Sequence, residues 1–293
     1  MDQLKRLLLN PYYAATWPWR TCRNRLAAQA GRAPAMVVYY HRIADDAANS
    51  WTVSNREFRR HVTWLERNFE LVSLEEVQRR VAGSCSTRPS VSITFDDGYA
   101  ENLDQALPWL IEQQVPCTYF VTTHNALSGD PFPHDLAMGN RFRPNTVPQL
   151  RDLSAAGIEI GAHTRTHADL GAVRDLETLA DEVVAATRDL EAAVGQRIRY
   201  FAFPFGMHAN LQPAAFGLAR EAGLEAVCSA YGGYNRPGDD PFHLQRFGGE
   251  GPLVRLKNWV TVDPLKERRI RRFVYQGAGP DFALSPPETA AVA

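Results

Sequence analysis

Short apolar runs and longer amphipathic stretches alternate along this chain. The apolar runs are typical of buried β-strands, and they cover residues 35–43, 90–95, 116–123, 158–163, 199–206 and 224–230. The longer stretches place apolar side chains at helical spacing, and they cover residues 54–69, 73–83, 101–114, 146–157, 176–195 and 212–223. Repeated strand–helix units without a clear break predict one α/β domain, whose mostly parallel sheet closes or nearly closes as a barrel.

Local signals mark the ends of some of these helices. Ser54 is the expected N-cap of the helix in 54–69, because its hydroxyl can accept a hydrogen bond from the first helical turn. The helix in 73–83 opens with a capping-box pattern and ends at Gly83. Several prolines between residues 124 and 145 predict an irregular loop there.

The composition is that of a soluble globular protein. Hydrophobic residues make up 45% of the 293 residues and charged residues make up 22%. The formal net charge of −1 gives no indication of a nucleic-acid partner. The chain contains no run of about eighteen apolar residues, so no transmembrane helix is expected. Its first residues lack the cleavage pattern of a secretory signal, and we therefore expect a cytoplasmic protein.

The cysteines give no indication of a structural site. Cys22, Cys85, Cys117 and Cys228 are far apart in the sequence and form no Cys-x-x-Cys pair. This spacing indicates neither a zinc–cysteine site nor a disulfide framework in a chain of this length. We expect buried or free thiols in a reducing compartment.

Residues 1–34 form a basic, aromatic lead-in to the domain. No acidic residue occurs between Asp2 and Asp45, whereas arginines alternate with aromatic residues there, namely Tyr12, Tyr13, Trp17 and Trp19. Basic and aromatic residues together are typical of a segment that lies on a membrane surface. The alternative is a helix that packs on the domain and buries its aromatic side chains. The first alternative would place the protein at the inner face of the membrane as a peripheral protein.

Residues 35–262 are expected to form the single folded domain, and residues 263–293 are expected to form a basic and then disordered tail. The basic stretch at 266–273 is more typical of solvated surface than of a binding site. The stretch at 276–293 is rich in alanine, proline and glycine and has no periodicity, which is typical of disorder. Nothing in the sequence indicates the oligomeric state.

Polar residues follow several of the predicted strands. Asp96 and Asp97 come directly after one strand, His163 ends another, and His41 lies near the end of the first. In parallel barrels the carboxyl ends of the strands form the mouth that carries the chemistry. His163 and His167 are spaced to share a helical face and to bind one ion, and a carboxylate from another strand end would complete the site. The alternative for Asp96 and Asp97 is an ordinary turn with an aspartate N-cap.

These polar strand ends belong to longer sequence motifs. The sequence TFDDG at 94–98 is followed downstream by HTRTH at 163–167 and by YFAFPFG at 200–206. Together the motifs resemble those of the polysaccharide deacetylase family of carbohydrate esterases, over residues 35–249. The segment VVYYHRI at 37–43 resembles the Tyr-His-x-Ile segment of a subgroup that deacetylates poly-N-acetylglucosamine. The resemblance implies a distorted (β/α) barrel of about seven strands, and a metal-dependent hydrolase that removes acetyl groups from sugars.

The resemblance also implies a role for each matching residue. The implied ligands of one divalent metal ion are Asp97, His163 and His167. The implied catalytic groups are the general base Asp96, the general acid His41 and the backbone N–H of Phe205, which would stabilise the oxyanion. Zinc is the expected ion because imidazole ligands suit it, and nickel, cobalt and iron are the alternatives. The expected partner is an N-acetylated sugar, a glycan or a precursor, such as a lipid-linked or nucleotide-linked sugar.

Two positions depart from the family pattern. Ala202 stands where many members carry an arginine that orients the catalytic aspartate, and Arg246 is a candidate replacement for it. His243 does not fall in the Leu-x-His motif that usually supplies the acid. The departures leave two alternatives open, a non-catalytic carbohydrate-binding protein and a hydrolase of another small amide. His124 ends a predicted strand and could line the mouth, and Trp51, Asp130 and Asp135 could shape a substrate groove, but nothing in the sequence assigns a role to them. The other histidines, His61, His134 and His208, have no such support.

Overall fold

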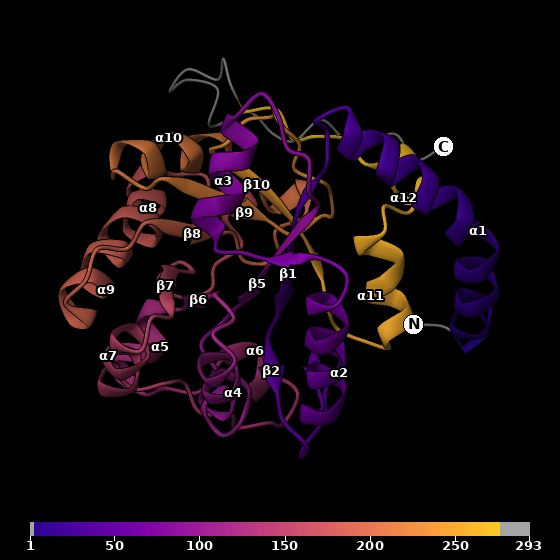
Figure 1. The fold of residues 1–293 in the computed structure, drawn as a ribbon. Helices are drawn as coiled ribbons and strands as arrows, with labels where there is room; N and C mark the ends of the chain where they lie inside the picture. The colour runs from indigo at the N-terminus through magenta and orange to yellow at the C-terminus, as the bar shows by residue number, and fades with distance from the viewer. Residues whose placement is uncertain (1–2, 276–293) are drawn as a thin grey trace.

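Seven parallel strands close into a barrel in the computed structural model, which describes residues 3–275 (Figure 1). The barrel strands are β1 (Ala35–Tyr40), β5 (Ser90–Phe95), β6 (Cys117–Val121), β7 (Glu159–Ala162), β8 (Tyr200–Ala202), β9 (Ala226–Ser229) and β10 (His243–Gly248). Their order around the barrel is β1-β10-β9-β8-β7-β6-β5, and β5 pairs with β1 to close it. The predicted (β/α) barrel of about seven strands is therefore confirmed.

Short strands lie at both ends of the barrel. Strand β4 (Glu70–Leu71) pairs with the first residues of β5, and strands β2 (Arg42–Ile43) and β3 (Thr52–Val53) form a small separate sheet beyond β1. In the pairing of β1 with β5, Tyr40 lies opposite Phe95. This register places the next residues, His41 and Asp96, side by side at the carboxyl end of the barrel.

Strand β10 is the one barrel strand that the sequence did not predict. Its residues alternate between two environments, with Leu244 in the apolar cluster inside the barrel and Phe247 in the larger cluster between strands and helices. All six of its residues are buried, but three of them are polar or charged, namely His243, Gln245 and Arg246. The strand therefore lacks the apolar run that marks the other barrel strands in the sequence.

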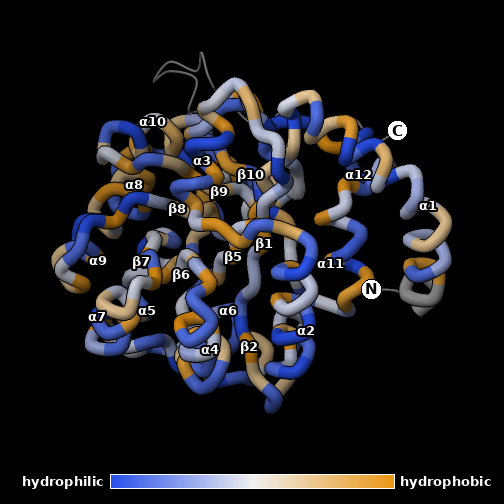
Figure 2. Tube along the Cα trace, viewed as in Figure 1, coloured by the Kyte–Doolittle hydropathy of each residue, from blue (hydrophilic) through white to orange (hydrophobic). Residues whose placement is uncertain are grey.

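The covering helices follow the predicted stretches with local differences. They are α2 (Asn55–Glu66), α3 (Leu74–Ala82), α4 (Ala106–Glu112), α7 (Val147–Ala155), α8 (Leu176–Ala180), α9 (Ala186–Val194) and α10 (Pro213–Glu221). Hydrophilic residues predominate on α2, and hydrophobic residues predominate along β6 and β8 (Figure 2). The predicted N-caps of the first two are confirmed, because Ser54 accepts from the Glu57 N–H and Ser73 accepts from the Glu76 N–H. The reciprocal bond of the capping box in α3 is not formed, because the carboxylate of Glu76 accepts from Arg79 and Arg80.

Two local predictions were wrong, and a third stretch differs in detail. The stretch 101–114 is not one helix, because a 3-10 turn η1 (Ala100–Leu103) precedes α4. The stretch 176–195 is continuously helical as predicted, with a π-helical turn η3 (Asp181–Ala185) between α8 and α9. The loop predicted at 124–145 contains two short helices, α5 (Thr123–Ser128) and α6 (Pro133–Leu136). Proline at the first position of α6 starts this helix, since the missing N–H is not needed there.

The N-terminal lead-in is the helix α1 (Gln3–Gln29), which packs on α11 (Leu253–Val260) and α12 (Pro264–Arg269) at the edge of the molecule (Figure 1). Arg20 is fully buried, and its guanidinium donates to the backbone and side-chain oxygens of Asn258 at 3.0 and 2.8 Å. Tyr12 donates to Asp263, and Arg23 pairs with Glu267. These contacts agree with a packed helix. The predicted disordered tail at 276–293 lies outside the described residues.

No helix among residues 3–275 is long and apolar enough to span a bilayer. The four cysteines are free: Cys22 and Cys85 are exposed, and Cys117 and Cys228 are buried. Burial raises the pKa of both buried thiols to about 12, which keeps them protonated and unreactive.

Candidate metal and catalytic site

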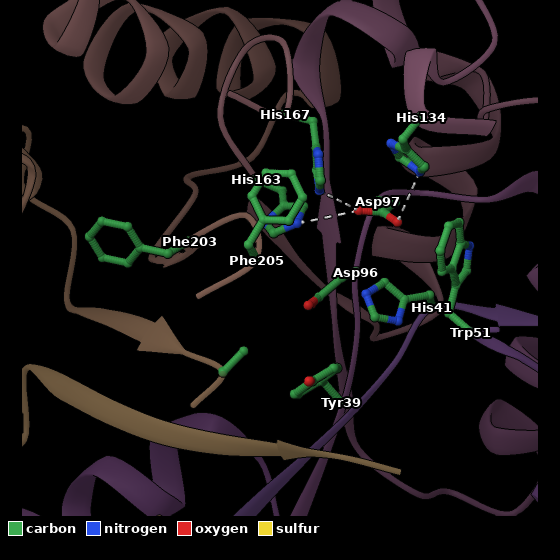
Figure 3. Close-up of a pocket in the computed structure, with 11 residues that line it drawn as sticks. Tyr39, His41, Trp51, Asp96, Asp97, His134, His163, His167, Phe203 and Phe205 are labelled. Carbon is green, nitrogen blue, oxygen red and sulfur yellow. Dashed lines mark ion pairs between the residues drawn. The ribbon is translucent and has the colours of Figure 1, made fainter. Parts of the chain in front are cut away.

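Asp97, His163 and His167 converge at the carboxyl ends of β5 and β7 (Figure 3). Asp97 Oδ1 lies 3.3 Å from His163 Nε2 and 3.2 Å from His167 Nε2. The three ligand atoms lie within 4.8 Å of one another, and the buried Asp97 Oδ1 has no hydrogen-bond donor. Two imidazole nitrogens and one carboxylate suit a divalent transition metal and leave positions free for water and substrate. The three predicted ligands therefore can hold a metal ion.

A backbone carbonyl orients His163 in this site. His163 Nδ1 lies 2.8 Å from the carbonyl oxygen of Ala202. Because a carbonyl oxygen only accepts, Nδ1 carries the proton, and the lone pair of Nε2 faces Asp97. Ala202, which lacks the arginine side chain of the family pattern, thus contributes to the site through its main chain.

The spacing of the two histidines suggested a shared helical face, but neither histidine lies on a helix. The chain after β7 is irregular, and Thr164 and His167 have positive φ values of 63° and 61°. Glu182 in η3 holds this segment by accepting from the N–H groups of Arg165 and Thr166. The histidines therefore converge through a turn that a neighbouring helix fixes. The π-helical turn is a device often found near functional sites.

Backbone strain concentrates around the candidate site. Seven non-glycine residues among 3–275 have positive φ, and four of them border this site: Asp97, Thr164, His167 and Phe205. The left-handed region is unfavourable for side chains with a Cβ, so each such residue costs about 1–3 kcal/mol. Strain that is kept at one place in a fold is typical of a functional site.

Asp96 is held by Arg246 from β10. The guanidinium binds it through two bonds, Nη1 to Oδ1 at 2.6 Å and Nη2 to Oδ2 at 2.9 Å, and both side chains are buried. Arg246 also donates to Thr94 and to the carbonyl of Ser229, which fixes its position. Burial alone would raise the pKa of Asp96, but the charge of Arg246 lowers it below its usual value. Asp96 is therefore an ionised, oriented carboxylate.

His41 is paired with Glu250, a residue that the sequence analysis missed. His41 Nδ1 lies 2.8 Å from Glu250 Oε1, which leaves Nε2 for another partner. Loss of solvent would lower the pKa of His41, but the hydrogen bond to Glu250 and the charges of Asp97, Glu250 and Asp96 raise it to about 9. His41 therefore carries a proton at neutral pH. Glu250 follows β10, so it could not be placed without recognising that strand.

The metal ligands, Asp96 and His41 share one cavity of about 250 Å³. The other residues that line it are Tyr39, Trp51, His134, Phe203, Phe205 and Ala230. The side chain of Phe205 is 54% exposed, and its backbone N–H makes no hydrogen bond to another described residue. All six predicted site residues therefore reach the same cavity. His134 is an additional lining residue for which the sequence contained no signal.

Three other histidines lie outside this cavity. His243 is buried outside the barrel and contacts Ser229 Oγ, and burial lowers its pKa to about 4, so it cannot serve as the acid of this cavity. His61 is buried against the hydroxyl of Tyr40. His124 is 52% exposed, lies outside the cavity and pairs with Asp130.

Comparisons with known proteins agree with the fold and the motifs. Residues 83–227 match a family model described as polysaccharide deacetylase. A chitooligosaccharide deacetylase of Sinorhizobium fredii is 32% identical over 153 residues, which are 51% of this chain and 60% of that protein. This chain spans 57% to 63% of the length of the curated relatives that it matches.

Two solved structures share the fold. IcaB from Ammonifex degensii has a TM-score of 0.66 and 23% identity, over 78% of this chain and 98% of that chain. The Streptococcus pyogenes deacetylase PplD in complex with acetate has a TM-score of 0.64 and 19% identity, over 78% of this chain and 99% of that chain. At these identities the likeness establishes the common fold.

Proposed function

Because this chain belongs to the polysaccharide deacetylase family, we propose that it is a metal-dependent hydrolase that removes N-acetyl groups from an N-acetylated sugar, glycan or glycan precursor. One observation carries this proposal: Asp97, His163 and His167 face the same cavity as the Arg246-bound Asp96 and the protonated His41. A metal site, an ionised carboxylate and a protonated imidazole are the groups that amide hydrolysis requires.

Each residue of the cavity has a separate role in the proposed hydrolysis. A divalent ion held by Asp97, His163 and His167 would activate water and polarise the acetyl carbonyl. Asp96 takes the proton from the attacking water. Its lowered pKa makes it a weak base, but a weak base suffices for an activated water. The free N–H of Phe205 donates to the developing oxyanion. His41 donates its proton to the leaving amine.

Arg246 supplies the guanidinium that many family members have in the third motif, where this chain has Ala202. It keeps Asp96 ionised and fixes the orientation of the carboxylate by binding both of its oxygens, as a bidentate guanidinium does. The absence of an arginine at Ala202 was the argument for a non-catalytic carbohydrate-binding protein. That argument loses its support when another strand provides the guanidinium. Acetate release from N-acetylglucosamine oligomers, measured with and without a chelator, tests the proposed activity against both a binding protein and a hydrolase of other amides.

The bound ion is proposed to be zinc, with nickel, cobalt and iron as alternatives. Replacing His163 with alanine is expected to remove nearly all of the metal, because it deletes one of three protein ligands. Metal analysis of the purified protein measures this directly. His124→Ala is the matched control, since this histidine is exposed and lies outside the cavity. Undiminished metal in His163→Ala would contradict the site.

A peripheral membrane contact through residues 1–34 and a location at the inner face of the membrane also belong to this proposal. Leu8, Trp19 and Leu26 are spaced by eleven and seven residues, so they return to one side of α1. Their exposed fractions are 58%, 50% and 59%. Arg20 and Arg23 are engaged within the protein, so the contact combines this apolar stripe with the charge of other basic residues of the helix, such as the exposed Arg25.

Binding to vesicles of anionic lipid is expected to be measurable at low salt and to weaken with added salt. Trp19→Ala is expected to reduce vesicle co-sedimentation several-fold, because tryptophan is a preferred residue at the membrane interface. Trp17→Ala is the matched control, because this equally exposed tryptophan lies two residues away, on the other side of the helix. Absence of binding to anionic vesicles at low salt would leave α1 as a purely packed helix.

A further inference from the structure

Trp51 stands on the side of the cavity where the sugar must lie if the proposed chemistry is correct. The acetyl carbon has to meet water between the metal ligands, Asp96 and the Phe205 N–H, and the amine has to leave toward His41. The ring of Trp51 lies 6.5 Å from the ring of His41, measured between centroids, and both line the cavity (Figure 3). The sugar carbon bonded to the leaving amine therefore lies near His41, where Tyr39, at 5.5 Å between ring centroids, and Trp51 are the two neighbouring aromatic rings of the cavity. Of these two, only Trp51 is an indole, the larger apolar surface.

We infer that Trp51 is a specificity-determining residue, which stacks on the pyranose ring that carries the scissile N-acetyl group. This inference rests on the proposed function. A pyranose has an apolar face of C–H groups, and an indole offers a large, rigid surface with a negative π face. Trp51 is partly exposed, so part of its ring surface is accessible to a ligand.

The orientation of Trp51 is fixed by a buried network. Its indole N–H donates to the hydroxyl of Tyr99 at 3.2 Å, and that hydroxyl donates to Asp135 Oδ2 at 2.6 Å. Tyr99 and Asp135 are both fully buried. The indole therefore has its polar atom satisfied on the protein side, and its apolar surface remains for the cavity.

A second connection fixes the turn that carries Trp51. The backbone N–H of Trp51 donates to the side-chain oxygen of Asn49, and the amide nitrogen of Asn49 reaches Asp135 Oδ1 at 3.3 Å. The carboxylate of Asp135 thus receives a bond from the turn on one oxygen and from Tyr99 on the other. It joins the segment between β2 and β3 to helix α6, which is far away in sequence. Asp135 is a positioning residue for Trp51.

The imidazole ring of His134 lies beside Trp51 in the cavity lining. His134, adjacent to Asp135 on α6, packs edge-on against Trp51 with ring centroids 5.6 Å apart. Its Nε2 lies 2.9 Å from the Tyr99 hydroxyl, so it joins the same network. Because these contacts hold the Trp51 side chain in one orientation, it loses little conformational entropy when a ligand binds, and this favours recognition of a rigid sugar ring.

The test compares a sugar substrate with one that has no pyranose. Acetate release is measured for N-acetylglucosamine oligomers and for an aryl acetate, in the wild-type protein, Trp51→Ala, Trp51→Phe and Asp135→Asn. Trp51→Ala is expected to raise KM for the oligomers by roughly ten-fold, the scale for loss of an aromatic anchor. The change in KM for the aryl acetate should be several-fold smaller. Trp51→Phe should recover part of the loss, and Asp135→Asn should share the direction of Trp51→Ala.

Binding without turnover gives a second readout. Calorimetric titration of the oligomers into Asp96→Asn should show weaker affinity when Trp51→Ala is added to that variant. Trp17→Ala is the matched control, because this tryptophan is exposed on α1 and lies outside the cavity. Unchanged affinity and KM in Trp51→Ala, with wild-type acetate release intact, would overturn the inference alone. Oligomer binding that depends on Trp51 in a protein without acetate release would support the inference and refute the proposed hydrolysis.

Discussion

Replacing His41 with alanine is expected to slow N-deacetylation by roughly 10²- to 10⁴-fold, the usual contribution of a general acid. An amine is a poor leaving group unless it is protonated, and His41 carries the proton nearest to the proposed position of that amine. An activated ester departs without protonation, so its hydrolysis should fall much less. The measurement is the ratio of amide to ester turnover in His41→Ala and in the wild-type protein.

The same variant should keep its metal and its fold, because His41 is not among the three ligands. His124→Ala serves as the control for removing a histidine that lies outside the cavity. Equal losses on the amide and on the ester would assign His41 to positioning. Full amide activity in His41→Ala would exclude it from the reaction.

The pH dependence tests the pairing of His41 with Glu250. With its pKa raised to about 9, His41 keeps its proton through neutral pH and loses it as the pH rises. The amide activity is therefore expected to fall as the pH rises through the pKa of His41. A bound cation would neutralise the charge of Asp97, which is one cause of the raised pKa, and the fall would then occur at a lower pH. Glu250→Gln removes one negative charge and should move this fall toward the ordinary histidine pKa of about 6.5. A fall of kcat/KM at the same pH in Glu250→Gln would contradict the pairing.

Asp96→Asn and Asp97→Asn are expected to fail in different ways. Asp96→Asn should lower turnover by roughly 10²-fold or more while most of the metal stays bound, since Asp96 is held by Arg246 and not by the ligand set. Asp97→Asn should lose both metal and activity, because it removes the only carboxylate of the set. Metal content and acetate release, measured on the same samples, separate the two outcomes.

The fold of Asp96→Asn has to be checked in the same experiment. Arg246 is fully buried, and removing the negative partner of a buried pair commonly costs about 3–5 kcal/mol. The asparagine oxygen can still accept from the guanidinium, so the variant should remain folded at a lower Tm. Identical loss of metal in the two variants, with both folded, would show that the proposed division between base and ligand is wrong.

The sequence alone determined the strands with apolar runs and the residues that follow them. In a parallel barrel every strand points its carboxyl end to the same mouth. Asp96, Asp97, His163, His41 and Phe205 follow such strands and could therefore be placed together without coordinates. The positions of Ser54 and Ser73 at helix starts were equally local, because a cap bonds to the turn beside it.

Only the tertiary structure decided which groups complete the site. Arg246 is 150 residues from Asp96, and they meet because β10 closes the barrel beside β1. Strand β10 contains buried polar residues, so no apolar run marks it, and Glu250 beyond it stayed hidden for the same reason.

The same holds for the convergence of the two histidines and for the N-terminal helix. His163 and His167 meet through left-handed residues that Glu182 stabilises from another helix, whereas their spacing suggested a helical turn. Arg20 became a buried packing residue because Asn258, 238 residues away, accepts its bonds. Local pattern specifies elements and their ends, but a buried charge acquires its role from a partner that only the closed fold supplies.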